Sequence, residues 1–272
     1  MAGGKGKRLQ PLSSDKRPKQ FLPLLSDKLM IDETIDRISP LFPSDSIYIS
    51  SIEKYRQEVQ RRPYKALIEP HGQGTSYSVL FSVLKIIQEY GDAVITMIPS
   101  DHAIKGVEYL NALSEAQERA ERKSEIVLLG VEPTEANDQY GYIKSIGNRV
   151  TQFIEKPSND YASFLIDHGC LWNTGHFTFK ASVMLKAFNV YDPDSVTVMR
   201  FGMKHDGLEP LYSKMLKPMN IEKSVIEKTQ RISVIPASFE WSDIGSMERL
   251  LSIWMNNEEL YKDRLSEFMW GG

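Results

Sequence analysis

The sequence predicts an α/β protein in which a mixed, mostly parallel sheet is flanked by helices. Short apolar runs alternate along the chain with stretches of helical periodicity, which is typical of strands joined by crossover helices. The run 93–98 is continuously apolar and leads into Pro-Ser-Asp-His, as expected of a buried strand with a polar end. A glycine-rich loop at residues 3–6 stands where such proteins often bind anions.

In the first half of the chain, strands and helices can be assigned from their periodicity. The helix 77–90 carries apolar residues at i, i+3 and i+4 spacing, and Gly91 is a suitable stop. The helix 109–123 is rich in charged residues and is expected on the surface. Strands are expected at 47–50, 66–68, 93–98 and 126–130.

After Val131 the pattern changes to short alternating stretches, which predict antiparallel strands. Strands are expected at 141–146, 150–154, 172–179 and 231–235, and helices at 181–188 and 246–256. With no internal repeat or clear linker, residues 1–272 are expected to form a single domain. We divide it into a lobe at about 1–130, a second at about 131–245 and a C-terminal helical segment at about 246–272.

Composition excludes several classes of protein. Hydrophobic residues at 41% and charged residues at 25% describe an ordinary globular chain. A net charge of −3 gives no general reason to bind nucleic acid or an anionic membrane, so we expect neither partner. The single cysteine, Cys170, rules out an internal disulfide framework. With no membrane-spanning run and no signal peptide, we expect a cytoplasmic protein.

The glycine loop is interpreted as a polyphosphate-binding loop. Gly3, Gly4 and Gly6 let backbone N–H groups approach an anion, and Arg8 and Lys19 follow as cations. The ending Lys-Arg-Leu at 7–9 matches neither a P-loop nor the dinucleotide fingerprint, and a solvated surface loop is the alternative. Such a loop normally follows the first strand of the sheet, yet only two residues precede it here.

Two aspartates are candidate metal ligands. Asp101 stands at the carboxyl end of a predicted strand, where α/β sheets bind ligands, and a carboxylate there suits Mg²⁺. The alternative for Asp101 is a helix cap. Asp243, in Trp-Ser-Asp-Ile-Gly, reads from the residues alone as part of a turn and helix start.

The ordered motifs resemble those of the sugar-1-phosphate nucleotidyltransferases. That family opens with Ala-Gly-Gly-x-Gly-x-Arg-Leu-x-Pro-Leu followed by Pro-Lys, and residues 2–12 and 18–19 agree. Pro-Lys-Gln-Phe-Leu at 18–22 looks like the mannose-1-phosphate guanylyltransferase branch. The resemblance spans six motifs from Gly3 to about Gly245 and implies a Rossmann-like GT-A nucleotidyltransferase fold. It makes 1–130 the nucleotide-binding lobe and 131–245 the sugar-phosphate lobe.

The resemblance also implies roles for individual residues. Asp101 in Pro-Ser-Asp-His and Asp243 in Trp-x-Asp-x-Gly correspond to the two Mg²⁺ ligands of the family. Lys156 in Phe-x-Glu-Lys-Pro corresponds to the lysine that pairs with the sugar phosphate, with Glu155 beside it. The motif Trp-Asn-Thr-Gly at 172–175 supplies Asn173 for sugar hydroxyls. Gly141 corresponds to a glycine beside the sugar. For Tyr140, Tyr142 and Trp172, core packing is the alternative.

One segment departs from the family pattern, Glu-Pro-x-Gly-Arg-Asn-Thr-Ala-Pro. Glu69, Pro70, Gly72 and Thr75 agree with it, whereas Gln73, Gly74 and Ser76 do not. We assign Glu69, Gly72 and Thr75 to nucleotide binding, because a carboxylate can accept from the N1–H and amino group of guanine. Because Gln73 and Gly74 stand in place of the Arg and Asn of the family pattern, the choice of nucleotide base stays open.

Together these features predict nucleotidyl transfer from GTP to mannose 1-phosphate with Mg²⁺. Arg8 and Lys19 would act on the triphosphate, Asp101 and Asp243 on the metal, and Lys156 on the sugar phosphate. The alternatives are another nucleoside triphosphate, a different hexose or heptose 1-phosphate, or a non-catalytic sugar-nucleotide-binding homologue. The end of the chain, 250–270, would pack on the core or form a homodimer interface.

Overall fold

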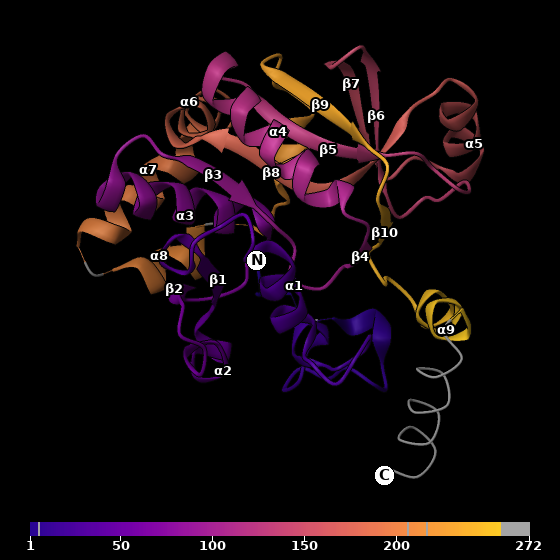
Figure 1. Cartoon of the computed structure of the whole chain (residues 1–272). Coiled ribbons are helices and arrows are strands. Elements are labelled where there is room, and N and C mark those ends of the chain that lie inside the picture. Colours follow the sequence, from indigo (N-terminus) through magenta and orange to yellow (C-terminus); the bar gives the residue numbers. More distant parts are fainter. Residues whose placement is uncertain (5, 206, 216, 257–272) are drawn as a thin grey trace.

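The computed structural model describes residues 1–4, 6–205, 207–215 and 217–256. Its largest sheet has six strands in the order β3-β8-β5-β9-β7-β6 (Figure 1). These strands are β3 Val94–Met97, β5 Ile126–Val131, β6 Gly141–Ile146, β7 Arg149–Glu155, β8 Leu171–Lys180 and β9 Ile232–Ala237. Two small sheets accompany it: β1 Tyr48–Ile52 with β2 Lys65–Glu69, and β4 Ala103–Lys105 with β10 Glu240–Ser242.

The α/β fold with helices flanking the sheets is confirmed, but the expected predominance of parallel strands is wrong for the pairings in the described part of the chain. Among the strands that the structure describes, only β1–β2 and β5–β9 pair in parallel. One cause is β8, which lies between β3 and β5 and runs antiparallel to both. The pairs β4–β10, β6–β7 and β7–β9 are antiparallel too. Alternation along a sequence indicates strands and helices, but it does not reveal that a late strand inserts between two early ones.

Helices lie around these sheets, and several begin or end close to their expected positions. The described helices are α1 Met30–Ile38, α2 Arg56–Gln60, α3 Thr75–Tyr90, α4 Glu108–Lys123, α5 Asn159–Asp167, α6 Ala181–Tyr191, α7 Pro193–Lys204, α8 Leu208–Met215 and α9 Met247–Met255. Short turns are η1 Lys7–Leu9, η2 Lys19–Phe21, η3 Ser44–Ser46, η4 Glu53–Tyr55 and η5 Glu222–Ile226. The sequence pattern missed α1, although its buried Ile31, Ile35 and Ile38 have helical spacing. Within the described ranges, no helix is long and apolar enough to cross a membrane.

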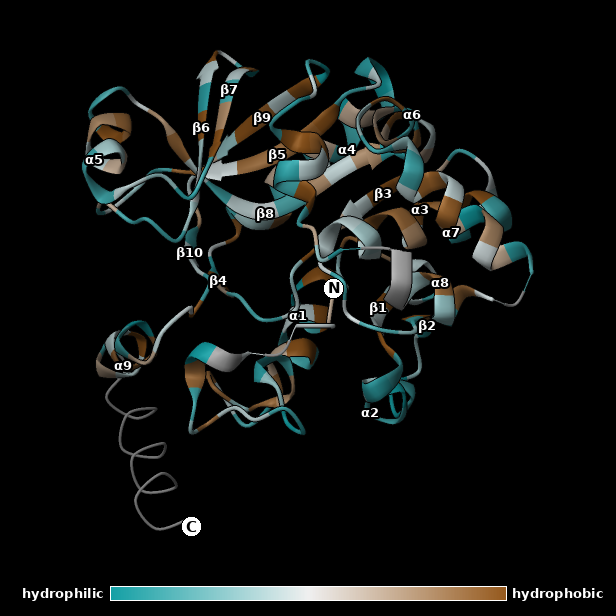
Figure 2. Ribbon diagram, turned by 180° about the vertical axis from the view of Figure 1, so that it is seen from behind, coloured by the Kyte–Doolittle hydropathy of each residue, from teal (hydrophilic) through white to brown (hydrophobic). Residues whose placement is uncertain are grey.

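The strand β5 is the centre of the hydrophobic core. All six of its residues are buried, and it is brown in the hydropathy view, in contrast to the teal helix α2 (Figure 2). Side chains alternate between the two faces of a strand. Val127 and Leu129 therefore pack in one cluster with Leu113 of α4, whereas Ile126 and Leu128 belong to a second. The second cluster also holds residues of α3 and α6.

A third cluster joins the two ends of the described chain. Leu9, Leu22 and Leu24 of the N-terminal loops pack with Leu250 and Trp254 of α9. In addition, the indole N–H of Trp254 donates to the carbonyl of Leu24 at 2.7 Å. Figure 1 shows the indigo loops and the yellow helix α9 on the same side, away from the large sheet. The expected helix 246–256 is thus confirmed, while 257–272 of the C-terminal segment lies outside the described residues.

Candidate active site

The glycine loop is held against the turn that carries Lys19. The side-chain amide of Gln20 donates to the carbonyls of Ala2 and Gly4, both at 3.0 Å. Gly6 has a φ of +60°, and a Cβ there would lie 2.8 Å from the backbone nitrogen of Lys19. A side chain at this position would displace the turn, so glycine is required for the close approach. The sequence pattern gave no role to Gln20.

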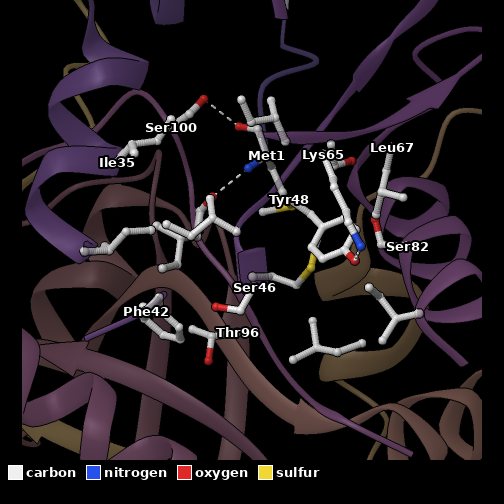
Figure 3. A pocket seen from close by; sticks show the side chains of 18 of the residues that line it. Met1, Ile35, Phe42, Ser46, Tyr48, Lys65, Leu67, Ser82, Thr96 and Ser100 are labelled. Atoms are coloured by element: carbon white, nitrogen blue, oxygen red, sulfur yellow. Dashed lines mark hydrogen bonds between the residues drawn. The ribbon is translucent and has the colours of Figure 1, made fainter. Parts of the chain in front are cut away.

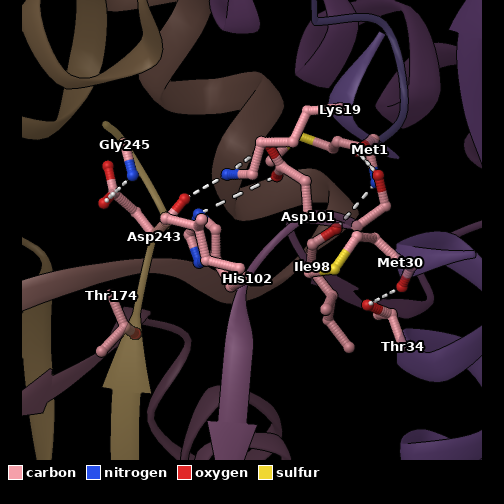
Figure 4. Close-up of polar contacts among 12 residues, drawn as sticks. Met1, Lys19, Met30, Thr34, Ile98, Asp101, His102, Thr174, Asp243 and Gly245 are labelled. Carbon is pink, nitrogen blue, oxygen red and sulfur yellow. Dashed lines mark hydrogen bonds and ion pairs between the residues drawn. The ribbon is translucent and has the colours of Figure 1, made fainter. Parts of the chain in front are cut away.

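Lys19 links the two segments that carry the candidate metal ligands (Figure 4). Its Nζ lies 3.1 Å from Oδ2 of Asp101 and also donates to the backbone carbonyl of Asp243. The side chain of Lys19 is buried, so this charge is shielded from water and its interactions are stronger than at the surface. Residues that are more than 140 positions apart in sequence therefore meet at one ammonium group.

Asp101 follows β3, as expected of a strand-end carboxylate. Burial raises the pKa of Asp101, but the Lys19 ammonium, together with His102 and the N-terminal amino group, holds it below its usual value. The preceding residue, Ser100, donates its N–H and its hydroxyl to the carbonyl of Met1, at 3.3 and 2.6 Å. The first residue of the chain therefore helps to position the segment of Asp101.

The carboxylate of Asp243 is anchored through one oxygen. Oδ1 accepts from the hydroxyl of Tyr140 at 2.9 Å and from the backbone N–H of Gly245 at 2.8 Å. Oδ2 lies 3.7 Å from the guanidinium of Arg8, whose side chain is mostly exposed. The bonds to Oδ1 thus fix the orientation of the Asp243 carboxylate. Its Oδ2 lies on the side of the exposed Arg8 side chain.

His102 is a structural link between the segments that carry the two acids. The strands β4 and β10 pair, so Ala103 lies opposite Ser242, and the indole N–H of Trp241 donates to Nδ1 of His102 at 3.1 Å. Burial lowers the pKa of His102 to about 4, although the nearby Asp101 opposes the shift. A neutral imidazole is the form that can accept this bond, so His102 joins the segments of the two acids.

The donor set suits a hydrated Mg²⁺ ion. Mg²⁺ in proteins commonly binds one or two carboxylates and completes its coordination with water and substrate phosphate oxygens. Asp101 places its carboxylate at the Lys19 ammonium, and Asp243 reaches the same ammonium through its backbone carbonyl. These two acids are the pair expected from the motifs. In the parts of the chain that the structure describes, no group of three or more His, Cys, Asp or Glu side chains could hold a metal by itself.

Glu69 is placed differently from the other nucleotide-binding candidates. It is buried, and its Oε2 accepts from the hydroxyl of Tyr212 on α8. Burial raises its pKa to about 7, although hydrogen bonds from Ser78 and Tyr212 oppose the shift. In this structure the carboxylate contacts Tyr212. Its contact with a nucleotide base stays a prediction, and binding of the base would have to displace the Tyr212 hydroxyl.

The departure from the family pattern at residues 73–74 has a structural account. Gly74 has a φ of +101°, and a Cβ there would lie 2.1 Å from the carbonyl oxygen of Met219. The backbone of Met219 also accepts from Ser76 at 3.2 Å and donates to Gln73 at 2.9 Å. Because the two backbones are this close, only glycine fits at position 74.

Gly72 and Thr75 lie on either side of this contact. A Cβ at Gly72 would be 3.9 Å from the carbonyl oxygen of Gly3, so the two glycine segments assigned to the nucleotide lie side by side. Thr75 begins α3, and its hydroxyl oxygen accepts from the backbone N–H of Ile221 at 3.0 Å. The hydroxyl of Thr75 therefore fixes the neighbouring segment in this structure.

In the second lobe, Lys156 is connected to the acids through Tyr140. The N–H of Lys156 donates to the carbonyl of Tyr140 at 3.2 Å, and the Tyr140 hydroxyl reaches Asp243. The side chain of Lys156 is half exposed, with Nζ 3.3 Å from Oε1 of the buried Glu155. A Cβ at Gly141 would lie 2.9 Å from Oε2 of Glu155, so this glycine makes room for protein atoms.

Asn173 and the aromatic residues complete this region. Asn173 is buried on β8, and its Oδ1 accepts from the N–H of Gly175 at 3.2 Å. The ring of Tyr140 lies edge-on to Trp172 and Trp241, with centroids 4.9 and 5.0 Å apart. Core packing, the alternative kept open for the aromatic residues, therefore holds for their rings. The hydroxyl of Tyr140 has the additional contact with Asp243 that the sequence pattern did not reveal.

The motifs, the fold and this geometry agree with the comparisons with known proteins. A model of the family described as "Nucleotidyl transferase" matches residues 1–259. The chain belongs to the nucleotidyl transferase family. Among curated relatives, "Alginate biosynthesis protein AlgA" of Pseudomonas syringae pv. tomato is 32% identical over 93% of this chain. "Mannose-1-phosphate guanylyltransferase RfbM" of Salmonella typhimurium is 30% identical over the same share.

A solved structure is also similar to this chain. This structure, titled "mannose-1-phosphate geranyltransferase" and from Thermus thermophilus, superimposes with a TM-score of 0.85 at 32% identity. The match covers 93% of this chain and 78% of that one. The alignments cover only 57% of the length of AlgA and RfbM, so this nucleotidyl transferase chain spans little more than half of those relatives.

Proposed function

We propose that the protein transfers GMP from GTP to mannose 1-phosphate, releasing GDP-mannose and pyrophosphate. The observation that carries this proposal is the convergence of Lys19, Asp101 and Asp243 beside a glycine loop. Cations and paired carboxylates at such a loop suit a magnesium-bound polyphosphate. The choice of mannose 1-phosphate is supported by the name of the RfbM relative.

The proposed reaction is a single in-line displacement. An oxygen of the sugar phosphate attacks the α-phosphorus of GTP, a new P–O bond forms and the bond to the β-phosphate oxygen breaks. Pyrophosphate leaves, and no covalent intermediate with the enzyme is required. Catalysis then depends on positioning and on charge neutralisation. We assign Arg8, Lys19 and the N–H groups of the glycine loop to the triphosphate.

Asp101 and Asp243 would hold the Mg²⁺ ion, which when bound neutralises charge on the reacting phosphate oxygens. Both acids are set for this task before substrate arrives. The Lys19 ammonium keeps Asp101 ionised, and Tyr140 orients Asp243. For the acceptor, Lys156 supplies a half-exposed point charge for the sugar phosphate, while Glu155 and Asn173 line the same lobe.

The test is release of pyrophosphate by the purified protein from GTP, mannose 1-phosphate and Mg²⁺. Replacing Asp101→Asn should lower turnover by about 100-fold or more, because it removes one of two metal-binding carboxylates. Asp167→Asn, at the exposed end of α5, is the matched control and should leave turnover unchanged. Full activity of Asp101→Asn, or no turnover by the unsubstituted protein with any nucleotide and sugar phosphate, would contradict the proposal.

A second candidate is the same reaction with another nucleoside triphosphate or with a different hexose or heptose 1-phosphate. It is motivated by the altered loop at Gln73 and Gly74 and by the contact of Glu69 with Tyr212. A competition assay among GTP, ATP, UTP and dTTP decides between the two. Clear preference for GTP with mannose 1-phosphate rejects this candidate.

Two further points concern the location of the protein and the alternative of a non-catalytic role. The single, buried Cys170 and the proposed nucleotide substrate support a cytoplasmic location. Tight binding of GDP-mannose without turnover would instead support a non-catalytic sugar-nucleotide-binding protein. The retained acids and lysines argue against that role.

A further inference from the structure

The chain after α8 runs between the two lobes of the candidate active site. We call residues 219–224 the bridge segment. The N–H of Ile221 donates to the hydroxyl oxygen of Thr75 at 3.0 Å. The hydroxyls of Ser224 and Ser76 share a hydrogen bond of 2.7 Å. These contacts fasten one side of the bridge segment to the beginning of α3, where candidates for nucleotide binding lie.

The other side of the bridge segment reaches the sugar-phosphate motif. Oδ1 of Asn220 accepts from the N–H of Lys223 at 3.3 Å, which leaves the amide NH2 group to face Glu155. This NH2 group donates to Oε1 of Glu155 at 3.5 Å. Beyond the segment, Oε1 of Glu227 accepts from the N–H of Glu155 at 3.1 Å. The local fold therefore directs the amide of Asn220 at the carboxylate of Glu155.

Oε1 of Glu155 is approached by two donors of different kinds. One is the ammonium of Lys156 at 3.3 Å, and the other is the neutral amide of Asn220. The side chain of Lys156 is 51% exposed, so its ion pair is weak and a phosphate can take the ammonium. The side chain of Glu155 is only 6% exposed. This carboxylate has little access to water, and leaving it without a donor would be strongly unfavourable.

The backbone of Lys156 indicates that the fold directs its side chain. Its φ is +50°, in the left-handed region that residues other than glycine rarely adopt. Such a conformation persists only where the surrounding structure enforces it, and it is concentrated at functional sites. Here the N–H of Lys156 is held by the carbonyl of Tyr140. The geometry is that of a lysine presented to a ligand.

We propose that Asn220 is a positioning residue for the sugar phosphate. Its amide stays on Oε1 of Glu155 when Lys156 leaves that oxygen for the phosphate. Lys156 can then bind the phosphate without leaving a buried carboxylate unpaired. This role rests on the proposed function, since the ligand of Lys156 is taken to be the phosphate of the acceptor.

A second acid of the bridge segment lies near the same lysine. Burial and the nearby carboxylate of Glu155 raise the pKa of Glu222 to about 7, although a backbone hydrogen bond and Lys156 oppose the shift. Near neutral pH a part of Glu222 is therefore uncharged, and the acids around Lys156 repel a phosphate less than two full charges would. A neutral donor such as Asn220 holds Glu155 without adding a charge to this group.

The test is the kinetics of Asn220→Ala with GTP and mannose 1-phosphate. The KM for mannose 1-phosphate should rise by about tenfold or more, because Lys156 is then the remaining donor to Oε1 of Glu155 and is released less readily. The KM for GTP and kcat should change by less than about twofold, as expected when only binding of the acceptor is weakened. Asn220→Asp keeps the size of the side chain and the acceptor for Lys223, so a role in packing alone predicts normal kinetics. We expect it to raise the same KM at least as much.

The matched control is Asn189→Ala on α6. Its exposed side-chain amide also donates to a carbonyl, that of Leu185 at 2.8 Å. This variant should leave both KM values unchanged. In a Glu155→Gln background, Asn220→Ala should raise the KM for mannose 1-phosphate by less than about threefold, because no buried charge then depends on the amide. Equal effects in the two backgrounds, or a normal KM in Asn220→Asp, would overturn the proposal.

Calorimetric titration with mannose 1-phosphate separates this proposal from the proposed function. If the unsubstituted protein releases no pyrophosphate but binds mannose 1-phosphate about tenfold more tightly than Asn220→Ala does, the role of Asn220 stands and the proposed function fails. If pyrophosphate is released and the two proteins bind mannose 1-phosphate equally, the proposed function stands and the role of Asn220 fails. Absence of any binding of mannose 1-phosphate would also overturn that role.

Discussion

Single side chains near the site are held by long-range contacts. Lys19 reaches Asp101 and Asp243, Tyr140 reaches Asp243, and Tyr212 reaches Glu69. The motifs identified the two acids and the lysine because their spacing and flanking residues are specific. The hydroxyl contacts of Tyr140 and Tyr212 were not predicted, because a sequence pattern does not show which partner a tyrosine hydroxyl will have.

Replacing Glu69→Gln should remove part of the pH dependence of stability. Burial raises the pKa of Glu69 in the folded protein to about 7, against an ordinary value of 4.5. The folded state therefore retains a proton that the unfolded chain releases, and this stabilisation is lost as the pH rises through the folded pKa. In urea unfolding between about pH 5 and pH 8, the unsubstituted protein should lose about 2 kcal/mol more than Glu69→Gln.

The control for this comparison is Glu115→Gln, on the exposed face of α4. It should follow the unsubstituted protein across the pH range. Parallel stability curves for Glu69→Gln and the unsubstituted protein would show that burial does not shift this carboxyl group.

At the scale of elements, two contacts between distant segments shape the site. The pairing of β4 with β10 brings the segment after Asp101 to the segment before Asp243. The loop 72–76 packs against residues 219–221 and thereby connects the start of α3 to the chain after α8. Neither contact has a local signal, because three-residue strands and irregular loops carry almost no periodicity.

Gly74→Ala should destabilise the protein by about 3 kcal/mol or more, because the new Cβ would collide with a backbone carbonyl and the positive φ is strained. The matched control is Gly147→Ala, at a φ of +55° with no atom within 4 Å of the Cβ position. The control should cost only about 1 kcal/mol, the cost of the left-handed backbone alone. Urea unfolding measures both variants, and equal losses would refute the collision with Met219.

At the scale of the whole molecule, the third hydrophobic cluster connects the N-terminal loops to α9. Leu9 and Ile244 of this cluster directly follow Arg8 and Asp243 in the sequence. The cluster therefore supports two candidate site residues from behind, and it joins parts of the chain that are more than 200 residues apart.

Trp254→Ala should lower the free energy of unfolding by about 3–5 kcal/mol, since it leaves a cavity in this cluster and an unpaired carbonyl at Leu24. Trp254→Phe keeps a ring in the cluster and loses only the hydrogen bond, so it should cost about 1–2 kcal/mol. Thermal and urea unfolding distinguish the two variants. A Trp254→Ala variant as stable as Trp254→Phe would mean that the cluster does not hold the ends of the chain together.

The sequence by itself determined the α/β class, most strands and the long helices, since their periodicity is local. It also determined the family, since six ordered motifs identify it. Only the tertiary structure decided the strand order, in which β8 enters between β3 and β5, because strand pairing depends on contacts that no local pattern records. It also placed the Lys19 ammonium against the carboxylate of Asp101 and the backbone carbonyl of Asp243. The close contact of Gly74 with Met219, and the cavity lined by residues of β1 and β3 (Figure 3), are likewise features of the tertiary structure. Each of these features depends on how distant segments pack, and packing is settled by the whole chain at once.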